Sequence, residues 1–215
     1  MKKIIALSLF VLLTLSCASA FASLHDTRAT IAAQYGEYRF VIDNDNQLWT
    51  KADWDAKGSK KAVANSYIHY FSRNGLHFQM EVQYDGTKPE SFVRAQRITP
   101  DMGIKIKELK DYLPEIYELA TAPEAGVFTT TNEITRNFRE KGSPVTLGVM
   151  VKKQIKRSST YYTMLAFSIK DEGRLVKDAK FITPDIYIEE LVLERRLIQE
   201  GSESQWAWQK TNMFK

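Results

Sequence analysis

The residues of this sequence that could carry acid–base or metal chemistry are few. Three histidines occur, His25, His69 and His77, and no two of them have the spacing that places two metal ligands on one helix face. His69 and His77 flank Asn74-Gly75, a dipeptide typical of a two-residue hairpin turn. Because strand side chains alternate between faces, this turn would put the two imidazoles on opposite faces. We therefore predict no metal site and expect His69 on the apolar face.

Carboxylates offer a second possible chemistry. The tetrad Ile-Thr-Pro-Asp occurs at residues 98–101 and again at 182–185. Asp101 and Asp185 could face each other as paired acids if the two halves of the chain were related by an approximate twofold axis. The same residues are explained by helix starts, with Thr as cap, Pro at the first position and Asp in the first turn. We interpret both tetrads as helix N-termini and predict no catalytic residue.

The turn at residues 43–47, Asp-Asn-Asp-Asn-Gln, is rich in oxygen ligands. It lacks the glycine and the terminal glutamate of a calcium loop. The composition therefore favours a solvated turn closed by its own aspartate side chain, and we expect no cofactor.

Aromatic and soft side chains are the best candidates for binding a ligand. Phe71, Phe78 and Met80 share the predicted apolar face of the hairpin with His69. Further rings cluster near the second half of the chain, where amphipathic aromatics favour binding surfaces. The predicted ligand-binding set is His69, Phe71, Phe78, Met80, Tyr161, Trp206 and Trp208.

The elements that must position these side chains begin with the hairpin. From Leu76 to Tyr84, apolar residues alternate with polar ones, which predicts one buried and one solvated strand face. Counting outward from the turn pairs Phe71 with Phe78, His69 with Met80 and Tyr67 with Val82 on the apolar face. Ser72 with His77 and Ile68 with Glu81 pair on the polar face, which also carries Gln79 and Gln83.

Caps and breakers predict the remaining elements. In the first half these are a helix from Ser23 or Asp26 to Gly36, strands at 38–43 and 91–99, a helix from Thr50 to Gly58, and a helix from Thr99 that Pro114 interrupts near Tyr112. In the second half they are a helix ending at Gly142 and strands at 143–157, 159–170 and 174–183. Residues 186–198 fit either a helix or a strand, and we expect a short helical turn that runs into a strand paired with residues 206–210.

The two halves resemble each other. Shifting the chain by 84 residues aligns residues 50–109 with 134–193 without a gap and gives twelve identities in sixty columns. We predict an α+β fold of two tandem, divergent helix–antiparallel-sheet units, or one continuous curved antiparallel sheet with helices on one face. The units span 23–111 and 112–215, after a segment at 1–22, and pack as one globular domain.

The segment at 1–22 resembles a secretory signal peptide. Two lysines precede a twelve-residue apolar run, which is shorter than the roughly 20 residues of a membrane-spanning helix, and small residues follow. Cleavage fits after Ala20 or Ala22, and the second is favoured. It leaves 193 residues without cysteine and lowers the net charge from +4 to +2, so neither disulfides nor a thiol nucleophile are expected.

Cys17 leaves a second possibility open at the N-terminus. The preceding Thr-Leu-Ser resembles a lipoprotein lipidation site, although the leucine stands nearer to the cysteine than in that pattern. Lipidation would anchor the chain to a membrane, whereas ordinary cleavage would release it into the periplasm or the medium.

Three function classes fit these observations. The first is a non-catalytic binding or interaction protein of the bacterial cell envelope, with an unknown protein or apolar small molecule as partner. The second is a carrier of a hydrophobic ligand, and the third is an envelope hydrolase. A near-balanced charge and export argue against nucleic acid, while Lys152, Lys153, Lys156 and Arg157 could contact a membrane.

The carrier alternative has one sequence argument of its own. The fifteen residues Asn-Gly-Leu-His-Phe-Gln-Met-Glu-Val-Gln-Tyr-Asp-Gly-Thr-Lys, at 74–88, resemble periplasmic lipoprotein-sorting and carrier proteins. The resemblance implies a curved sheet that encloses lipid, and no residue's role is carried over from it. The carrier alternative predicts an apolar cavity lined by Phe71, Phe78, Met80 and Met164.

Overall fold

The structure, a computed structural model, describes residues 26–122, 125–130, 146–156, 159–171, 174–175 and 183–197. The helices are α2 (Arg28–Tyr35), α3 (Lys51–Ala56), η1 (Gly58–Lys60), η2 (Ile106–Glu108), α4 (Leu109–Tyr112) and α5 (Pro114–Ala120). The strands are β1 (Phe40–Asp43), β2 (Leu48–Thr50), β3 (Ala64–Arg73), β4 (Leu76–Tyr84), β5 (Val93–Pro100), β6 (Ile104–Lys105), β7 (Ala125–Thr130), β8 (Thr146–Lys156), β9 (Ser159–Asp171), β10 (Arg174–Leu175) and β11 (Tyr187–Leu197). The fold is therefore α+β, as predicted.

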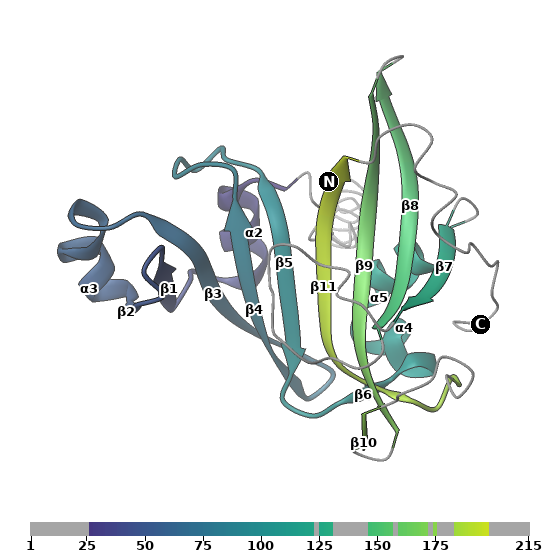
Figure 1. The fold of residues 1–215 in the computed structure, drawn as a ribbon. Coiled ribbons are helices and arrows are strands. Elements are labelled where there is room, and N and C mark those ends of the chain that lie inside the picture. The colour runs from purple at the N-terminus through teal and green to yellow at the C-terminus, as the bar shows by residue number, and fades with distance from the viewer. Residues whose placement is uncertain are drawn as a thin grey trace, which may run out of the picture.

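The strands of the described residues form one antiparallel sheet. It has 11 strands in the order β2-β1-β3-β4-β5-β11-β9-β8-β7, with β10 paired to β9 and β6 paired to β11. Figure 1 shows β11 standing between the strands of the first half and those of the second. Residues 187–197 are thus a strand, and the residues expected to pair with them, 206–210, lie outside the described residues.

The β3–β4 hairpin confirms the predicted register. Phe71 lies opposite Phe78, His69 opposite Met80 and Ser72 opposite His77. The turn residues Asn74 and Gly75 have positive φ angles of 50° and 82°, as a type I′ turn requires. The alternating pattern and the turn chemistry therefore agree, which leaves one register available to this hairpin.

Local capping explains the short helices. The cap of α2 is Thr27 and not the predicted Ser23 or Asp26, and it accepts a hydrogen bond from the Thr30 amide over 3.2 Å. Thr50 caps α3 in the same way through the Asp53 amide, as predicted. Pro114 occupies the first position of α5 after α4 ends at Tyr112, so the predicted interruption is confirmed.

The prediction that the Ile-Thr-Pro-Asp tetrads start helices is wrong. At 98–100 the chain continues as β5, with Ile98 opposite Met80 and Pro100 opposite Phe78, because Ile98 is buried against the core. In the second tetrad the Ile186 amide donates to the Thr183 carbonyl over 3.1 Å, which makes a β-turn with Pro184 at its second position. Pro100 lies at the end of a strand and Pro184 lies in a turn, and neither position requires a backbone amide proton.

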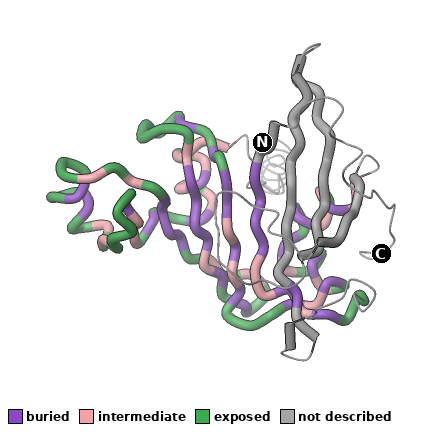
Figure 2. The backbone as a smooth tube through the Cα atoms, in the orientation of Figure 1, coloured by how far each residue is buried: buried purple, intermediate pink, exposed green. Residues whose placement is uncertain are grey.

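The helices cover one face of the sheet. Ile31 and Tyr35 of α2, together with apolar residues of η2, α4 and α5, pack on the face formed by Phe78, Met80 and their neighbours. Figure 1 shows α2, α4 and α5 on the same side of the sheet, while α3 lies at the β2 end. The buried residues follow the central strands in Figure 2. A smaller apolar cluster of Tyr38, Val41, Trp54 and Tyr67 fills the β1 end.

Candidate functional site

Four of the predicted ligand-binding residues lie on the helix-covered face of the hairpin. Phe78 and Met80 are 1% and 0% exposed, and the rings of Phe71 and Phe78 stack with centroids 4.9 Å apart. Tyr35 of α2 contacts Phe71 at a centroid distance of 4.8 Å. These residues therefore form the interface between the sheet and α2.

His69 has a structural role on the same face. It is 2% exposed, and its Nδ1 donates to the carbonyl of Gly36 over 2.9 Å, just where α2 ends. Burial is the largest cause of its lowered pKa, so the imidazole is neutral near neutral pH. The side chain thereby ties the end of α2 to β3.

His77 lies on the opposite face, as predicted. Its Nδ1 is 2.6 Å from the Oγ of Ser72, a distance that would suit a base and a nucleophile. Asp101, however, accepts from the backbone amide of His77 over 3.4 Å and does not orient the imidazole. The pair is exposed and is best described as a cross-strand hydrogen bond.

Asp101 and Asp185 do not form a catalytic pair. Asp185 is 63% exposed and its Oδ1 lies 2.6 Å from Lys107 Nζ and 3.8 Å from Lys105 Nζ. Asp101 instead contacts the tip of the β3–β4 hairpin through His77. The two carboxylates therefore serve different elements.

Asp43 closes the turn at residues 43–47 with a buried carboxylate. Its Oδ1 accepts from the amides of Asp45 and Gln47 over 2.9 and 2.8 Å, and its Oδ2 accepts from the indole of Trp49 over 2.8 Å. The predicted Asx turn is confirmed, but its aspartate is 1% exposed and not solvated. Both oxygens of the Asp43 carboxylate are therefore occupied by donors of the same turn and of β2.

This turn makes the stability of the protein sensitive to acid. The hydrogen bond from Trp49 is the largest cause of the lowered pKa of Asp43, so the ionised form stabilises the fold above the ordinary pKa, 3.8, and this contribution is lost as the pH falls through the lowered value. We expect Asp43→Asn to reduce the Tm by a few degrees at pH 7, with the difference from wild type shrinking below about pH 4. Thermal unfolding across pH measures this, with the exposed Asp45→Asn as control. A difference that is constant with pH would contradict it.

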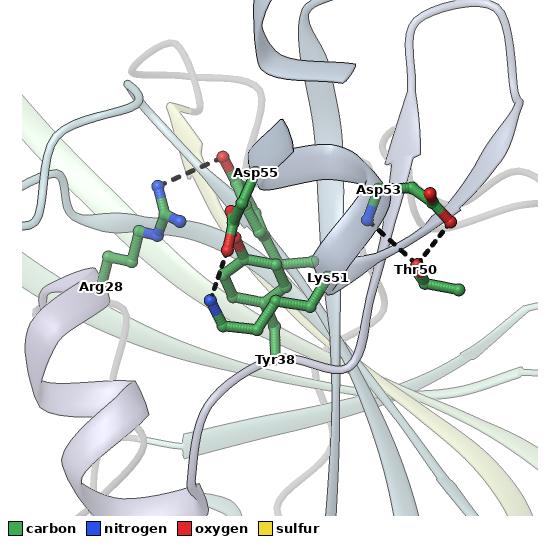
Figure 3. Close-up of polar contacts among 7 residues, drawn as sticks. Arg28, Tyr38, Thr50, Lys51, Asp53 and Asp55 are labelled. Carbon is green, nitrogen blue, oxygen red and sulfur yellow. Dashed lines mark hydrogen bonds and ion pairs between the residues drawn. The ribbon is translucent and has the colours of Figure 1, made fainter. Parts of the chain in front are cut away.

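A polar cluster joins α2 to α3 (Figure 3). The guanidinium carbon of Arg28 lies 4.2 Å from the ring centroid of Tyr67 and 5.3 Å from that of Tyr38. Tyr38 donates to Asp55 Oδ1 over 2.7 Å, and Lys51 donates to Asp55 Oδ2 over 2.6 Å. Burial, followed by the bond to Asp55, raises the pKa of Tyr38, so its hydroxyl stays protonated. The cluster holds the β1 end of the molecule together.

The polar face of the hairpin is less solvated than predicted. Glu81 and Gln83 are 8% and 7% exposed, because β4 is flanked by strands whose polar side chains meet its own. Ser66 donates to Glu81, and Arg97 lies 3.8 Å from Glu81 and 3.6 Å from Glu190. These contacts balance the charges across β3, β4, β5 and β11.

Gln96 is the most unusual polar residue of the helix-covered face. It lies in β5 directly opposite Val82 of β4 and Leu193 of β11, which are both part of the apolar core. Its exposure is 0%, and among the described residues neither Nε2 nor Oε1 has a hydrogen-bond partner. A buried amide with both groups unpaired is costly, and such groups in native proteins call for an explanation.

Two further polar atoms without partners belong to elements around Gln96. The hydroxyl of Tyr84, on the same face of β4, is buried and has no hydrogen-bond partner in the part of the chain that the structure describes, and the same holds for Oε1 of Gln34 in α2. The ring of Tyr84 packs against both apolar clusters. Donor and acceptor groups on α2, β4 and β5 are thus unpaired on the helix-covered face.

The remaining predicted site residues lie elsewhere. Tyr161 is in β9, opposite Lys153 of β8 and Leu197 of β11. Trp206 and Trp208 lie outside the described residues, as does Arg157 of the basic run, while Lys152, Lys153 and Lys156 are in β8. His69, Phe71, Phe78 and Met80 therefore lie together on the β3–β4 hairpin. Tyr161 pairs with residues of β8 and β11 and not with this hairpin.

Within the part of the chain that the structure describes, no helix has the length and apolarity to cross a membrane. No three His, Cys, Asp or Glu side chains are grouped to hold a metal ion in these same ranges. Comparison of the chain with protein-family models, curated proteins and solved structures finds no match.

Proposed function

We propose that this chain is a non-catalytic binding protein of the cell envelope that holds an apolar ligand between its sheet and α2. The ligand would lie against the apolar face around Phe78 and Met80 and would present a polar group to Gln96. This proposal joins the binding role to the hydrophobic-carrier alternative. Export is supported by the charged, apolar and small-residue order of segment 1–22.

The unpaired amide of Gln96 is the observation that carries the proposal. Leaving a buried donor or acceptor unsatisfied costs about 1–3 kcal/mol. An apolar side chain of similar size would fit the neighbourhood of Val82, Ile98 and Leu193 at lower cost, since all are buried. A ligand whose polar group completes the hydrogen bonds of Gln96 accounts for an amide at this position.

The way α2 is attached would let it move aside. Its first turn is tied by two backbone bonds, from Arg28 to Ser91 and from Ala29 to Pro89, each 2.9 Å long. Only two side chains of α2, those of Ile31 and Tyr35, are buried in the core. Few buried apolar side chains are typical of elements with low local stability.

Gln96→Met separates a structural amide from a ligand-binding one. We expect this change to raise the free energy of unfolding of ligand-free protein by about 1–3 kcal/mol, because it removes two unpaired polar groups, and to lower the amount of bound ligand. Urea unfolding measures the first effect, and mass spectrometry of organic extracts from protein purified out of its own cells measures the second.

Gln79→Met is the matched control for this experiment. Gln79 lies on the other face of the sheet, where its Oε1 accepts from the Tyr70 hydroxyl over 3.2 Å. It should leave the bound ligand unchanged. The proposal is overturned if the wild-type protein carries no small molecule, or if Gln96→Met carries as much as the wild type.

A protein-interaction role is the second candidate, favoured by an aromatic patch on the other face. Tyr70 is 40% exposed, its ring lies 6.4 Å from that of Phe40, and the guanidinium carbon of Arg39 lies 5.6 Å from its centroid. Exposed rings beside arginine are enriched in interface hot spots. If this role is the principal one, Tyr70→Ser abolishes partner binding while Gln96→Met leaves it unchanged.

We also propose that the two hairpins derive from one duplicated unit. The 84-residue shift places β4 on β9, and the equivalent residues Ile104 and Ile188 lie directly opposite each other in the β6–β11 ladder. The copies have diverged, since Leu109 starts a helix while Leu193 is in a strand. Met80 and Met164 also pair at different registers, with His69 and Met150 respectively.

A further inference from the structure

We propose that the polar group read by Gln96 is a neutral carboxamide, so that the ligand is an amphiphile with an acyl-amide end. This inference rests on the binding function proposed above and specifies the chemistry of the ligand. It follows from the groups that Gln96 offers, from the lack of charge around them and from the neighbouring unpaired atoms.

Gln96 offers one donor group and one acceptor side by side. Its Nε2 can donate and its Oε1 can accept, and neither is paired with any residue that the structure describes. An amide group of the ligand supplies a carbonyl that accepts from Nε2 and an N–H that donates to Oε1, so one group forms both hydrogen bonds with Gln96. A carboxylate supplies only acceptors and an ammonium only donors, so either would leave half of Gln96 unpaired.

The side chains directly beside Gln96 on this face carry no charge. The residues directly opposite, Val82 and Leu193, are 0% and 2% exposed, and Ile98 on the same face of β5 is 2% exposed. Burying an unpaired charge among such side chains is far more costly than burying a hydrogen-bonded amide. A carboxylic acid would have to be protonated here, although carboxyl groups are ionised near neutral pH.

The neighbouring unpaired atoms suit the same ligand. Tyr84 keeps its hydroxyl proton, because burial raises its pKa, and the hydroxyl can donate to a carbonyl oxygen, which has two lone pairs. Oε1 of Gln34 in α2 can accept from an N–H group. Each of these groups matches an amide, and the acyl chain would continue over Phe78 and Met80.

Three probes with one chain length test the inference on the whole mature protein. Dodecanamide has donor and acceptor, N,N-dimethyldodecanamide has only the acceptor, and dodecanoate is charged. Displacement of a bound fluorescent apolar dye, 1-N-phenylnaphthylamine, gives the Kd of each at pH 8. We expect dodecanamide to bind about tenfold more tightly than either of the others, the factor that one unmet buried hydrogen bond produces.

Gln96→Met assigns the preference to its residue. We expect this variant to bind the three probes within about twofold of one another, because its thioether neither donates nor accepts strongly. Equal affinities of the wild type for all three probes would overturn the inference and leave the binding function standing. The same holds if Gln96→Met keeps the tenfold preference. If the dye does not bind and purified protein carries no small molecule, the binding function itself fails.

Discussion

Replacing Phe78 with alanine is expected to lower the free energy of unfolding by about 3–5 kcal/mol. Phe78 is 1% exposed, stacks on Phe71 and pairs across the ladder with both Phe71 and Pro100. Its removal takes a large apolar surface out of the core and leaves a cavity that strands held on both sides cannot close. Urea unfolding monitored by circular dichroism measures the change through the midpoint.

Phe92→Ala is the matched control for this substitution. Phe92 is the same residue type but is 47% exposed, so the truncation should change the free energy of unfolding by no more than about 0.5 kcal/mol. Similar losses for both variants, or a Phe78→Ala loss below about 1 kcal/mol, would show that the helix-covered face is not packed as described.

Breaking the ion pair between Arg73 and Glu115 is expected to destabilise the protein by about 3 kcal/mol. Arg73 Nη1 contacts both carboxylate oxygens of Glu115 over 2.7 and 2.6 Å, and the Glu115 side chain is 7% exposed. Arg73 also lies over the ring of Phe71, at 5.7 Å, so Arg73→Met retains much of its packing. The loss of stability in Arg73→Met therefore measures the cost of leaving the Glu115 charge buried without its partner.

A double-mutant cycle isolates this effect. Arg73→Met with Glu115→Gln should cost clearly less than the sum of the single changes, since neither charge is then left alone. Lys51 and Asp55 form the control pair, because their nitrogen–oxygen distance is also 2.6 Å but their side chains are 39% and 50% exposed. We expect a coupling of about 0.5 kcal/mol for that pair. Equal couplings in the two cycles would mean that burial of Glu115 contributes nothing.

The Arg73–Glu115 pair fixes the place of α5 on the sheet. The pair joins the tip of the β3–β4 hairpin to the first turn of α5, and Asn74 Nδ2 donates to the carbonyl of Asp111 in α4 over 2.6 Å. The hairpin turn that sets the strand register thus also contacts α4, next to the ion pair that contacts α5. Asn74→Asp removes the donor of the bond to Asp111, and we expect it to lower the Tm in thermal unfolding.

Local chemistry made part of the fold predictable. The hairpin register follows from strict alternation on both sides of Asn74-Gly75, because a shift of one residue would turn every apolar side chain to the wrong face. The end of α2 at Gly36, the start of α3 at Thr50 and the interruption at Pro114 follow from glycine, capping and the missing proline amide. In each case neighbours within a few residues decide the structure.

The tetrads and β11 were not predictable in the same way, because distant contacts decide them. Residues 98–101 carry every feature of a helix start, yet Ile98 is held in β5 by Met80 on one side and Leu191 on the other. Residues 187–197 contain good helix formers and become a strand because β5 and β9 leave one ladder position between them.

The key residue of the candidate site was hidden by a bulge. Strict alternation counted from Val93 places Gln96 on the opposite face, whereas alternation counted from Ile98 places it on the apolar face. The ladder pairs Gln83 with Ala95 but Tyr84 with Val93, so β5 carries one extra residue there. The bulge lets Val93 share the apolar face with Gln96 and Ile98. Only the pairing of the two strands reveals it.

The place of β11 in the sheet has a consequence for how the protein is made. Leu191 lies beside Ile98, so this contact forms only after the ribosome has added most of the chain. Without β11, β5 and β9 would each have an open edge, and such edges pair readily with other chains. β11 therefore protects both neighbouring strands from pairing with other chains.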